Sequence, residues 1–246
     1  VEMPVVYRNN GDGTFTNVAE QVRLNKTFMV TMGCNYGDID NDGFIDFYAG
    51  TGAPDFRAIV PNKMFKNEGG SHFVDVTNSS GLGHLQKGHG TAIADIDNDG
   101  DQDIYCSLGG FYKGDVFNNA LFQNPGTDKN WITLRLEGTK SNRSAVGARV
   151  RLALIDEAGK PRYICRTVSS GGTFGGNSFQ LEVGIGNATL VEQLVIDWPI
   201  EGGKRQTFQN LTANNIYQIK EGDSVPLILK IPTIEVKEPS GKHHHH

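Results

Sequence analysis

The chain has little of what marks membrane or redox proteins. No run among its 246 residues approaches 18 consecutive apolar side chains, which excludes a transmembrane helix. It has only three cysteines and no Cys-x-x-Cys pair, and the odd number leaves at least one thiol free or paired with another chain. No signal peptide is visible, but the sequence starts at Val1 rather than Met, so we expect a processed or truncated N-terminus.

Common catalytic motifs are missing as well. Neither Gly-x-Ser-x-Gly nor His-Glu-x-x-His occurs in the chain. Residues 170–176 are rich in glycine, but they lack the spacing of a phosphate-binding loop and a following helix. The sequence therefore offers no set of catalytic residues and favours a protein that is not an enzyme.

Negative charge is concentrated in the first half of the chain. Residues 1–130 have 17 acids and nine bases, a net charge of -8, whereas residues 131–246 have a net charge of +3. Of these 17 acids, 14 are aspartate, which favours turns and sites for hard metal ions. The acidic first half argues against a nucleic-acid-binding surface there, and we expect neither nucleic acid nor membrane insertion among the interactions.

Glycine, by contrast, is abundant, with 31 residues, and many glycines fall within an internal repeat. An aromatic-x-Asn element begins at Tyr7, Phe65 and Phe122, with spacings of 58 and 57 residues. An Asp-rich segment begins at Asp38 and again at Asp95, which is also a spacing of 57 residues. Because independent elements agree on the spacing, the first half is a repeat rather than a chance similarity.

Each repeat unit is predicted to consist of short strands. Aromatic and β-branched runs bounded by glycine predict strands at 44–49 and 104–108. Asn-Gly and Asp-Gly within residues 9–13 predict a hairpin turn, because both pairs supply the positive φ that a tight turn needs. Units of four short strands with this period are typical of propeller blades, so residues 1–126 are predicted to form a partial β-propeller.

The pattern changes after a predicted linker at 125–130. Alternating strands predict a small β-sandwich over residues 131–222, with strands at 131–136, 148–154, 162–168, 179–183, 190–197 and 215–219. Five arginines make this part basic and form either a solvated strand face or one that meets the acidic repeats: Arg143, Arg149, Arg151, Arg162 and Arg166. Residues 223–242 are predicted to be a tail that docks or is mobile, and residues 243–246 a tag remnant. The predicted fold class is all-β throughout.

Both Asp-rich segments have the spacing of a calcium-binding loop, Asp-x-Asp-x-Asp-Gly-x-x-Asp. Three carboxylates at alternate positions face one point, the glycine permits a sharp turn, and the seventh position offers a backbone carbonyl. Such an all-oxygen cage suits Ca²⁺ better than Mg²⁺, which sheds water reluctantly. We therefore predict two Ca²⁺ sites with the candidate ligands Asp38, Asp40, Asp42, Phe44 and Asp46 in the first loop and Asp95, Asp97, Asp99, Asp101 and Asp103 in the second.

These loops differ from a helical EF-hand. The twelfth position is Ala49 in one loop and Cys106 in the other, so the ninth-position aspartates are predicted to close the cage instead. A turn that binds no metal is the alternative interpretation. It would place several carboxylates within a few ångströms of one another, at about 1–4 kcal/mol for each pair. Two loops in register therefore favour bound cations, which we expect to have a structural role.

The motifs resemble known families. The stretch from Tyr7 to Phe15 and the stretch from Gly37 to Gly43 resemble FG-GAP/VCBS propeller repeats. The second half resembles the ASPIC/UnbV domain that follows such repeats, through residues 138–150, 170–174, 183–186 and 191–199. One departure is that residues 182–186 read Glu-Val-Gly-Ile-Gly where the family often has His-Phe-Gly-Leu-Gly, so any role of that histidine is absent here.

The resemblance implies a protein of the cartilage-acidic-protein-like group that is extracellular, on the cell surface or periplasmic, with a role in calcium-dependent adhesion to a protein or glycan ligand. One alternative is the accessory or catalytic part of a Ca²⁺-dependent carbohydrate-active enzyme. Another is an assembly module that pairs through an exposed blade edge. Propellers need about 4–8 blades and only two complete loop units are present. We therefore expect the chain to be the C-terminal part of a longer propeller, with its remainder as partner, or the missing edge to be covered by the sandwich domain or by another chain.

Overall fold

The computed structural model describes residues 3–52, 55, 59–110, 112–172 and 174–236. These residues form 17 β-strands and no helix, which confirms the predicted all-β class. Among them there is consequently no helix with the length and apolar character that a membrane crossing requires. The predicted tag remnant at 243–246 and residues 237–242 of the predicted tail lie outside the described residues.

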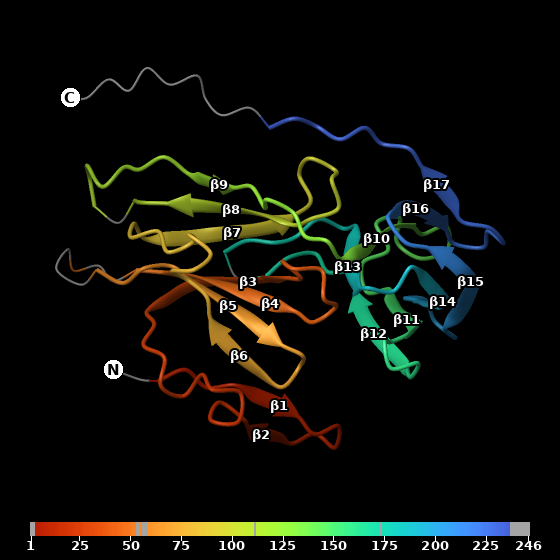
Figure 1. The fold of residues 1–246 in the computed structure, drawn as a ribbon, viewed down its shortest axis with the longest axis horizontal. Helices are drawn as coiled ribbons and strands as arrows, with labels where there is room; N and C mark the ends of the chain where they lie inside the picture. The colour runs from red at the N-terminus through yellow and green to blue at the C-terminus, as the bar shows by residue number, and fades with distance from the viewer. Residues whose placement is uncertain (1–2, 53–54, 56–58, 111, 173, 237–246) are drawn as a thin grey trace.

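The repeat half consists of three antiparallel sheets, none of which closes on itself (Figure 1). The first is a hairpin of β1 (Tyr7–Asn9) and β2 (Phe15–Asn17), as its Asn-Gly turn predicts. The second sheet has the strand order β3 (Thr31–Gly37), β4 (Asp46–Thr51), β5 (Lys63–Glu68) and β6 (His72–Asp75). The third has the order β7 (Gly88–Ala94), β8 (Asp103–Leu108) and β9 (Ala120–Phe122).

Alternation along these strands builds the core of the repeat half. Tyr48 of β4, Met64 of β5 and Ile93 of β7 are buried in one hydrophobic cluster, which joins the second and third sheets. On the second sheet, the ring of Phe47 stacks on Phe65 with centroids 4.7 Å apart and meets the edge of Phe73 at 5.0 Å. These aromatic contacts hold the outer hairpin β5–β6 against β4.

The second half is a sandwich of two four-stranded sheets. One sheet has the order β13 (Leu181–Gly186), β10 (Asn130–Glu137), β16 (Asn215–Lys220) and β17 (Leu227–Leu229), and β10 and β16 run parallel. The other has the order β12 (Pro161–Thr167), β11 (Arg149–Ile155), β14 (Leu190–Trp198) and β15 (Lys204–Thr212). Side chains from both sheets, among them Leu134, Leu152 and Leu194, share one buried core.

Two elements of the sandwich were not in the sequence prediction. Strand β15 is mostly polar, and only Phe208 and Leu211 in it are buried, so it lacks the apolar alternation that marks β11. Strand β17 lies in the predicted tail and pairs with β16. The chain then runs back toward the repeat half (Figure 1), where the amide of Ile234 donates to the carbonyl of Asp97 at 2.7 Å. The described part of the tail is therefore docked.

Glu221 fixes one end of the sandwich. Its side chain is 4% exposed, and its Oε2 accepts hydrogen bonds from the backbone amides of Thr139, Lys140 and Ser141 at 2.8–2.9 Å. Burial by itself raises the pKa of Glu221, but the three amide donors outweigh it and lower the pKa to about 2. The carboxylate thus joins the loop after β10 to the end of β16.

Acid should weaken this contact. Because the folded-state pKa lies below the ordinary value of 4.5, the stabilisation is complete above that pH and is lost as the pH falls toward 2. Replacing the carboxylate in Glu221→Gln should cost about 1.5–3 kcal/mol of unfolding free energy at pH 7, the usual worth of hydrogen bonds to a charged group. Urea titrations of both proteins at several pH values measure this. Equal losses at pH 7 and pH 2 would contradict the assigned role.

Candidate metal centre

Two loops with the same spacing of aspartates connect the inner strands of the repeat sheets. The first connects β3 to β4, and the second connects β7 to β8. In each loop the fourth and sixth positions have positive φ, namely Asn41 at 54° and Gly43 at 88°, then Asn98 at 61° and Gly100 at 98°. The glycine is required because a side chain at this φ is strained. The two loops therefore curl in the same way.

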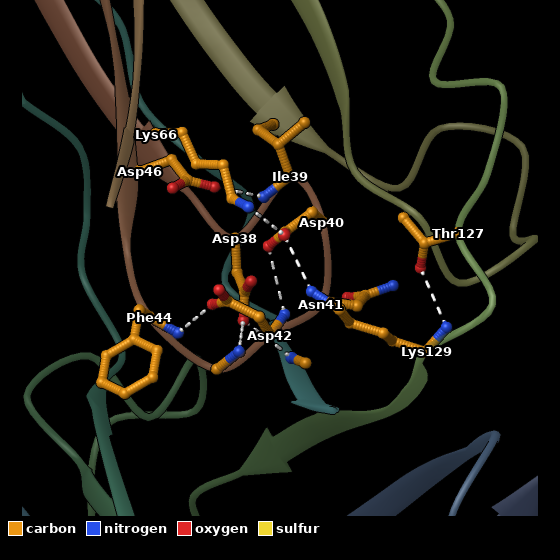
Figure 2. A network of polar contacts seen from close by, with 12 residues as sticks. Asp38, Ile39, Asp40, Asn41, Asp42, Phe44, Asp46, Lys66, Thr127 and Lys129 are labelled. Atoms are coloured by element: carbon orange, nitrogen blue, oxygen red, sulfur yellow. Dashed lines mark hydrogen bonds and ion pairs between the residues drawn. The ribbon is translucent and has the colours of Figure 1, made fainter. Parts of the chain in front are cut away.

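The curl gathers the predicted carboxylates. One oxygen from each of Asp38, Asp40 and Asp42 lies within 4.8 Å of the others. Figure 2 shows these three side chains turned toward one another inside the loop. The second loop gathers its first three aspartates to the same limit, namely Asp95, Asp97 and Asp99. Six of the ten predicted ligand residues are thus brought together in two groups of three.

Three carboxylate side chains of the first loop have hydrogen-bond or ion-pair partners, but one of their buried oxygens has none. Asp38 is 1% exposed, and its Oδ2 accepts the amide of Gly43 at 2.9 Å, whereas its Oδ1 is buried without a hydrogen-bond partner. Asp40 Oδ2 forms ion pairs with Lys66 at 3.1 Å and Lys129 at 2.8 Å. Asp42 Oδ1 accepts the amide of Phe44 at 2.8 Å.

The second loop also leaves one carboxylate oxygen without a partner, but at its third position rather than its first. Asp95 accepts the amides of Asp99 and Gly100, both at 3.1 Å. Asp97 is 2% exposed; its Oδ2 accepts from Gln123 at 2.6 Å, and its Oδ1 is buried without a hydrogen-bond partner. Each loop therefore holds one buried carboxylate oxygen that no described donor satisfies.

Burial and neighbouring charges shift the pKa values of these carboxyl groups. Burial raises the pKa of Asp38 to about 7, against the opposing charge of Arg166. Burial also raises the pKa of Asp95 to about 7, and the nearby carboxyl of Glu182 adds to the shift. For Asp40, burial acts in the same direction, but Lys129 and Lys66 outweigh it and leave the pKa below its usual value. A divalent cation would favour the charged form of all three groups.

The residues present fit Ca²⁺. Every gathered side chain is a carboxylate, which is the donor that hard cations prefer, and the spacing is that of a calcium loop. The two unsatisfied buried oxygens on Asp38 and Asp97 lack a partner that a cation would supply. The predicted ligand set remains a prediction at every position, and the seventh- and ninth-position side chains are not among the gathered ones.

The ninth-position aspartates accept hydrogen bonds from both sides of the blade. Asp46 accepts the amides of Ile39 at 3.0 Å and Asn67 at 2.7 Å (Figure 2 shows the first). Asp103 does the same with Ile96 at 3.1 Å and Asn124 at 2.8 Å. These bonds join the end of each Asp-rich loop to β5 in the second sheet and to the residues just after β9 in the third.

Sequence reasoning identified the aromatic-x-Asn element but missed its role. The side-chain amide of Asn67 donates to the carbonyl of Ile45 at 3.1 Å, and that of Asn124 donates to Gln102 at 3.2 Å. Together with the backbone bonds to Asp46 and Asp103, each asparagine clamps the end of a loop. The matching period of the asparagines and the Asp loops was the signal that could have revealed this role.

The seventh positions differ between the loops. The Phe44 ring lies under the Arg162 guanidinium, 4.5 Å from its centroid. The Asp101 side chain accepts from the Asn41 side chain at 2.7 Å and from the amide of Thr127 at 3.4 Å. Asp101 therefore uses its carboxylate between the loops, and only its backbone carbonyl was predicted as a ligand.

The two loops contact each other directly. Asn41 also donates to the carbonyl of Gly100 at 3.1 Å. Gln102 of the second loop accepts the amide of Asp38 at 2.6 Å and donates to Glu182 of β13 at 2.8 Å. The loops are thus one connected network.

Sandwich strands complete this network. Arg162 of β12 donates to the carbonyl of Asp42 at 2.6 Å, and Arg166 donates to that of Gly43 at 3.2 Å. On β13, the amides of Gly184 and Gly186 donate to Asp38 Oδ2 at 3.2 Å and to the carbonyl of Asn41 at 2.9 Å. Of the five arginines noted in the sequence, these two meet the acidic repeats, while Arg143, Arg149 and Arg151 are exposed.

Family comparisons agree with this two-part structure. A model described as FG-GAP-like repeat matches residues 2–49, and a model described as ASPIC and UnbV matches residues 138–226. The chain carries an FG-GAP-like repeat followed by an ASPIC and UnbV domain. The FG-GAP-like match includes the whole first loop, and the ASPIC and UnbV match includes Arg162, Arg166 and Gly184, which contact that loop. The second loop lies between the two matched segments.

A curated relative is similar over a shorter stretch. Cartilage acidic protein 1 of Xenopus tropicalis is 34% identical over 90 residues, which is 36% of this chain. The match spans only 13% of the length of that relative.

Proposed function

We propose that the chain is a calcium-stabilised binding module of extracellular type, in which two Ca²⁺ ions fix the repeat sheets against the sandwich. The observation that carries this proposal is the pair of buried carboxylate oxygens without partners, Asp38 Oδ1 and Asp97 Oδ1, in two loops of identical spacing. Buried polar atoms are normally satisfied, so one such oxygen in each loop, at the first position of one loop and the third position of the other, points to a missing ligand.

In this proposal, the first ion is held by Asp38, Asp40 and Asp42 and the second by Asp95, Asp97 and Asp99. Bound Ca²⁺ supplies two positive charges that offset the repulsion among each group of carboxylates. The chain's own residues do the rest. Asn67 and Asn124 hold the loop ends, while Arg162, Arg166 and Gly184 hold the first loop against the sandwich.

A cavity beside the first loop is where we place a ligand. It has a volume of about 670 Å³ and is lined by Asp42, Phe44 and Lys129 from the loop side and by Glu157 and Glu192 from the sandwich side. The proposed role is binding of a protein or glycan outside the cell, on its surface or in the periplasm, rather than catalysis. A glycan array screened with Ca²⁺ and then with EGTA tests this part. Binding that is indifferent to calcium would count against it.

Stoichiometry tests the metal sites themselves. Isothermal titration of the chain with CaCl₂ should give two ions per chain, and Asp38→Asn or Asp97→Asn should each remove one, because each removes a charged ligand. Asp12→Asn is the matched control: Asp12 is an exposed aspartate whose Oδ1 accepts from Thr14 within its own turn, so two ions should remain. A chain that takes up no Ca²⁺ would overturn the proposal.

A further inference from the structure

The two Asp-rich loops exchange hydrogen bonds in both directions through two side chains that are not predicted ligands, the bridging residues Asn41 and Gln102. Asn41 is 2% exposed, and its side-chain amide donates to the carbonyl of Gly100 at 3.1 Å and to the carboxylate of Asp101 at 2.7 Å. In the other direction, the side-chain oxygen of Gln102 accepts the amide of Asp38 at 2.6 Å. Each loop therefore helps to fix the backbone of the other.

These bridging contacts lie in a tightly packed region. Gln102 is 6% exposed. A Cβ built on Gly37, which directly precedes the first loop, would lie 2.6 Å from the Gln102 side-chain oxygen and 2.5 Å from the side chain of Ile93 in β7. The backbone that enters the first loop thus rests on the second loop and on the strand before it. Because closely packed interiors transmit displacements, a movement of one loop must shift the other.

The bridging residues belong to this junction and do not repeat with the loops. At the 57-residue spacing, Asn41 of the first loop corresponds to Asn98 of the second, and Gln102 of the second corresponds to Ile45 of the first. Ile45 has no polar side-chain atom, and within the part of the chain that the structure describes the Asn98 side chain forms no hydrogen bond with the first loop. The asymmetry provides a matched position in each loop for comparison.

A sandwich residue holds one bridging residue in place. The side-chain NH₂ group of Gln102 donates to Glu182 of β13 at 2.8 Å, and the other carboxylate oxygen of Glu182 accepts from Gln180 at 2.7 Å. The Gln102 amide is thereby oriented with its NH₂ group toward β13 and its oxygen toward the first loop. Glu182 also acts on the second loop, because its carboxyl group adds to the effect of burial in raising the pKa of Asp95.

We propose that the two loops bind Ca²⁺ with positive cooperativity, and that Asn41 and Gln102 are the positioning residues that couple them. The ions themselves rest on the proposed function. In an empty loop the gathered carboxylates repel one another and favour an open arrangement, which would break the hydrogen bonds to the other loop. Filling either loop restores the shared arrangement, so the next ion meets a loop that is already in place. Such coupling is reciprocal and typically worth about 5–150-fold in affinity.

Charge acts against this coupling. The first ion reduces the negative potential that attracts the second, and two bound cations repel each other. Salt weakens this opposing effect, because the Debye length falls from about 10 Å at 0.1 M to about 3 Å at 1 M, whereas buried contacts are screened much less. The hydrogen-bonded coupling therefore predicts that cooperativity is greater in about 1 M than in about 0.1 M KCl, even though both affinities are lower.

A thermodynamic cycle measures the coupling by isothermal titration with CaCl₂. Asp97→Asn leaves only the first site, and Asp38→Asn leaves only the second. The product of the two stepwise affinities of the parent chain should exceed the product of these two single-site affinities by about 5–150-fold. In an Asn41→Gly background the two products should agree. Glycine suits the positive φ of 54° at this position, so the variant removes the bridge without straining the turn.

Asn98→Gly is the matched control, because Asn98 has a φ of 61° at the same loop position and should keep the excess. Glu182→Ala should reduce the excess, whereas Glu182→Gln, which still offers Gln102 an acceptor, should retain most of it. A merely structural role for Asn41 would lower stability or both affinities and leave the ratio of products unchanged. An excess that survives Asn41→Gly would overturn the assignment of the bridging residues.

The outcomes separate this coupling from the metal sites. A parent chain that binds no Ca²⁺ would contradict the proposed function itself. Two bound ions whose product of affinities does not exceed that of the single-site variants, at either salt concentration, would overturn the coupling alone. That comparison uses only the parent chain and its two single-site variants, so it decides the matter even if Asn41→Gly does not fold.

Discussion

Removal of calcium is expected to lower the melting temperature of this chain by about 10–20 °C. A ligand present at 100 times its dissociation constant stabilises the folded state by about 2.7 kcal/mol, so two such ions contribute about 5 kcal/mol. In a protein of this size, each kcal/mol shifts the melting temperature by about 2–4 °C. The physical reason lies in the loops, where buried carboxylates repel one another and two buried oxygens lack a partner.

Scanning calorimetry in CaCl₂ and in EGTA measures this difference. Mg²⁺ at the same concentration is the metal control and should restore little of the loss, because it demands a stricter octahedral geometry. A variant with both Asp38→Asn and Asp97→Asn should melt at nearly the same temperature in either buffer. If the parent chain itself melts at one temperature in both buffers, the loops are metal-free turns.

A single methyl group at Gly184 is expected to separate the first Asp-rich loop from the sandwich. A Cβ built on this glycine would overlap the backbone of Asn41, which lies at the centre of the loop. Backbone cannot move aside as a side-chain end can, so Gly184→Ala should cost about 1–3 kcal/mol of unfolding free energy or more. The variant also displaces the amide that donates to Asp38. Calcium affinity at this loop should therefore fall, by about tenfold for each 1.4 kcal/mol of binding free energy that is lost.

Gly172→Ala is the matched control, because the nearest atom to its added Cβ lies 3.9 Å away. Chemical denaturation and calcium titration of both variants measure the two effects. The predicted pattern is a loss of stability together with weakened binding of one ion in Gly184→Ala, and neither in Gly172→Ala. Normal calcium binding in a destabilised Gly184→Ala protein would show that this strand does not support the loop.

Much of this architecture could be predicted from the sequence because it follows from local rules. The 57-residue period placed the loops and the repeated hairpins, and alternating apolar residues placed strands such as β11. The carboxylate spacing alone predicts which aspartates gather in each loop. Strand β15 was not predicted, because its position depends on neighbouring strands in the sandwich and its own sequence has no apolar alternation.

The relation between the two halves could not be predicted in the same way. Contacts such as Gly184 with Asp38 join residues 146 positions apart, and nothing in the spacing of either segment encodes that distance. The basic character of the second half was visible, but not which arginines would face the loops. Likewise, Asn67 of the aromatic-x-Asn element has the sequence context of an ordinary turn residue, and only its hydrogen bonds to Asp46 and Ile45 reveal its role.

The position of the first loop has a mechanical consequence. Arg162, Arg166 and Gly186 attach the sandwich to backbone carbonyls of that loop. A force that pulls the two halves apart would therefore load this loop, together with the other hydrogen bonds that join the halves, such as Gln102 to Glu182 and Asn177 to Asn35. With an ion in place, that load would fall on metal–oxygen bonds, and the rupture force of the junction would rise with the calcium concentration around it.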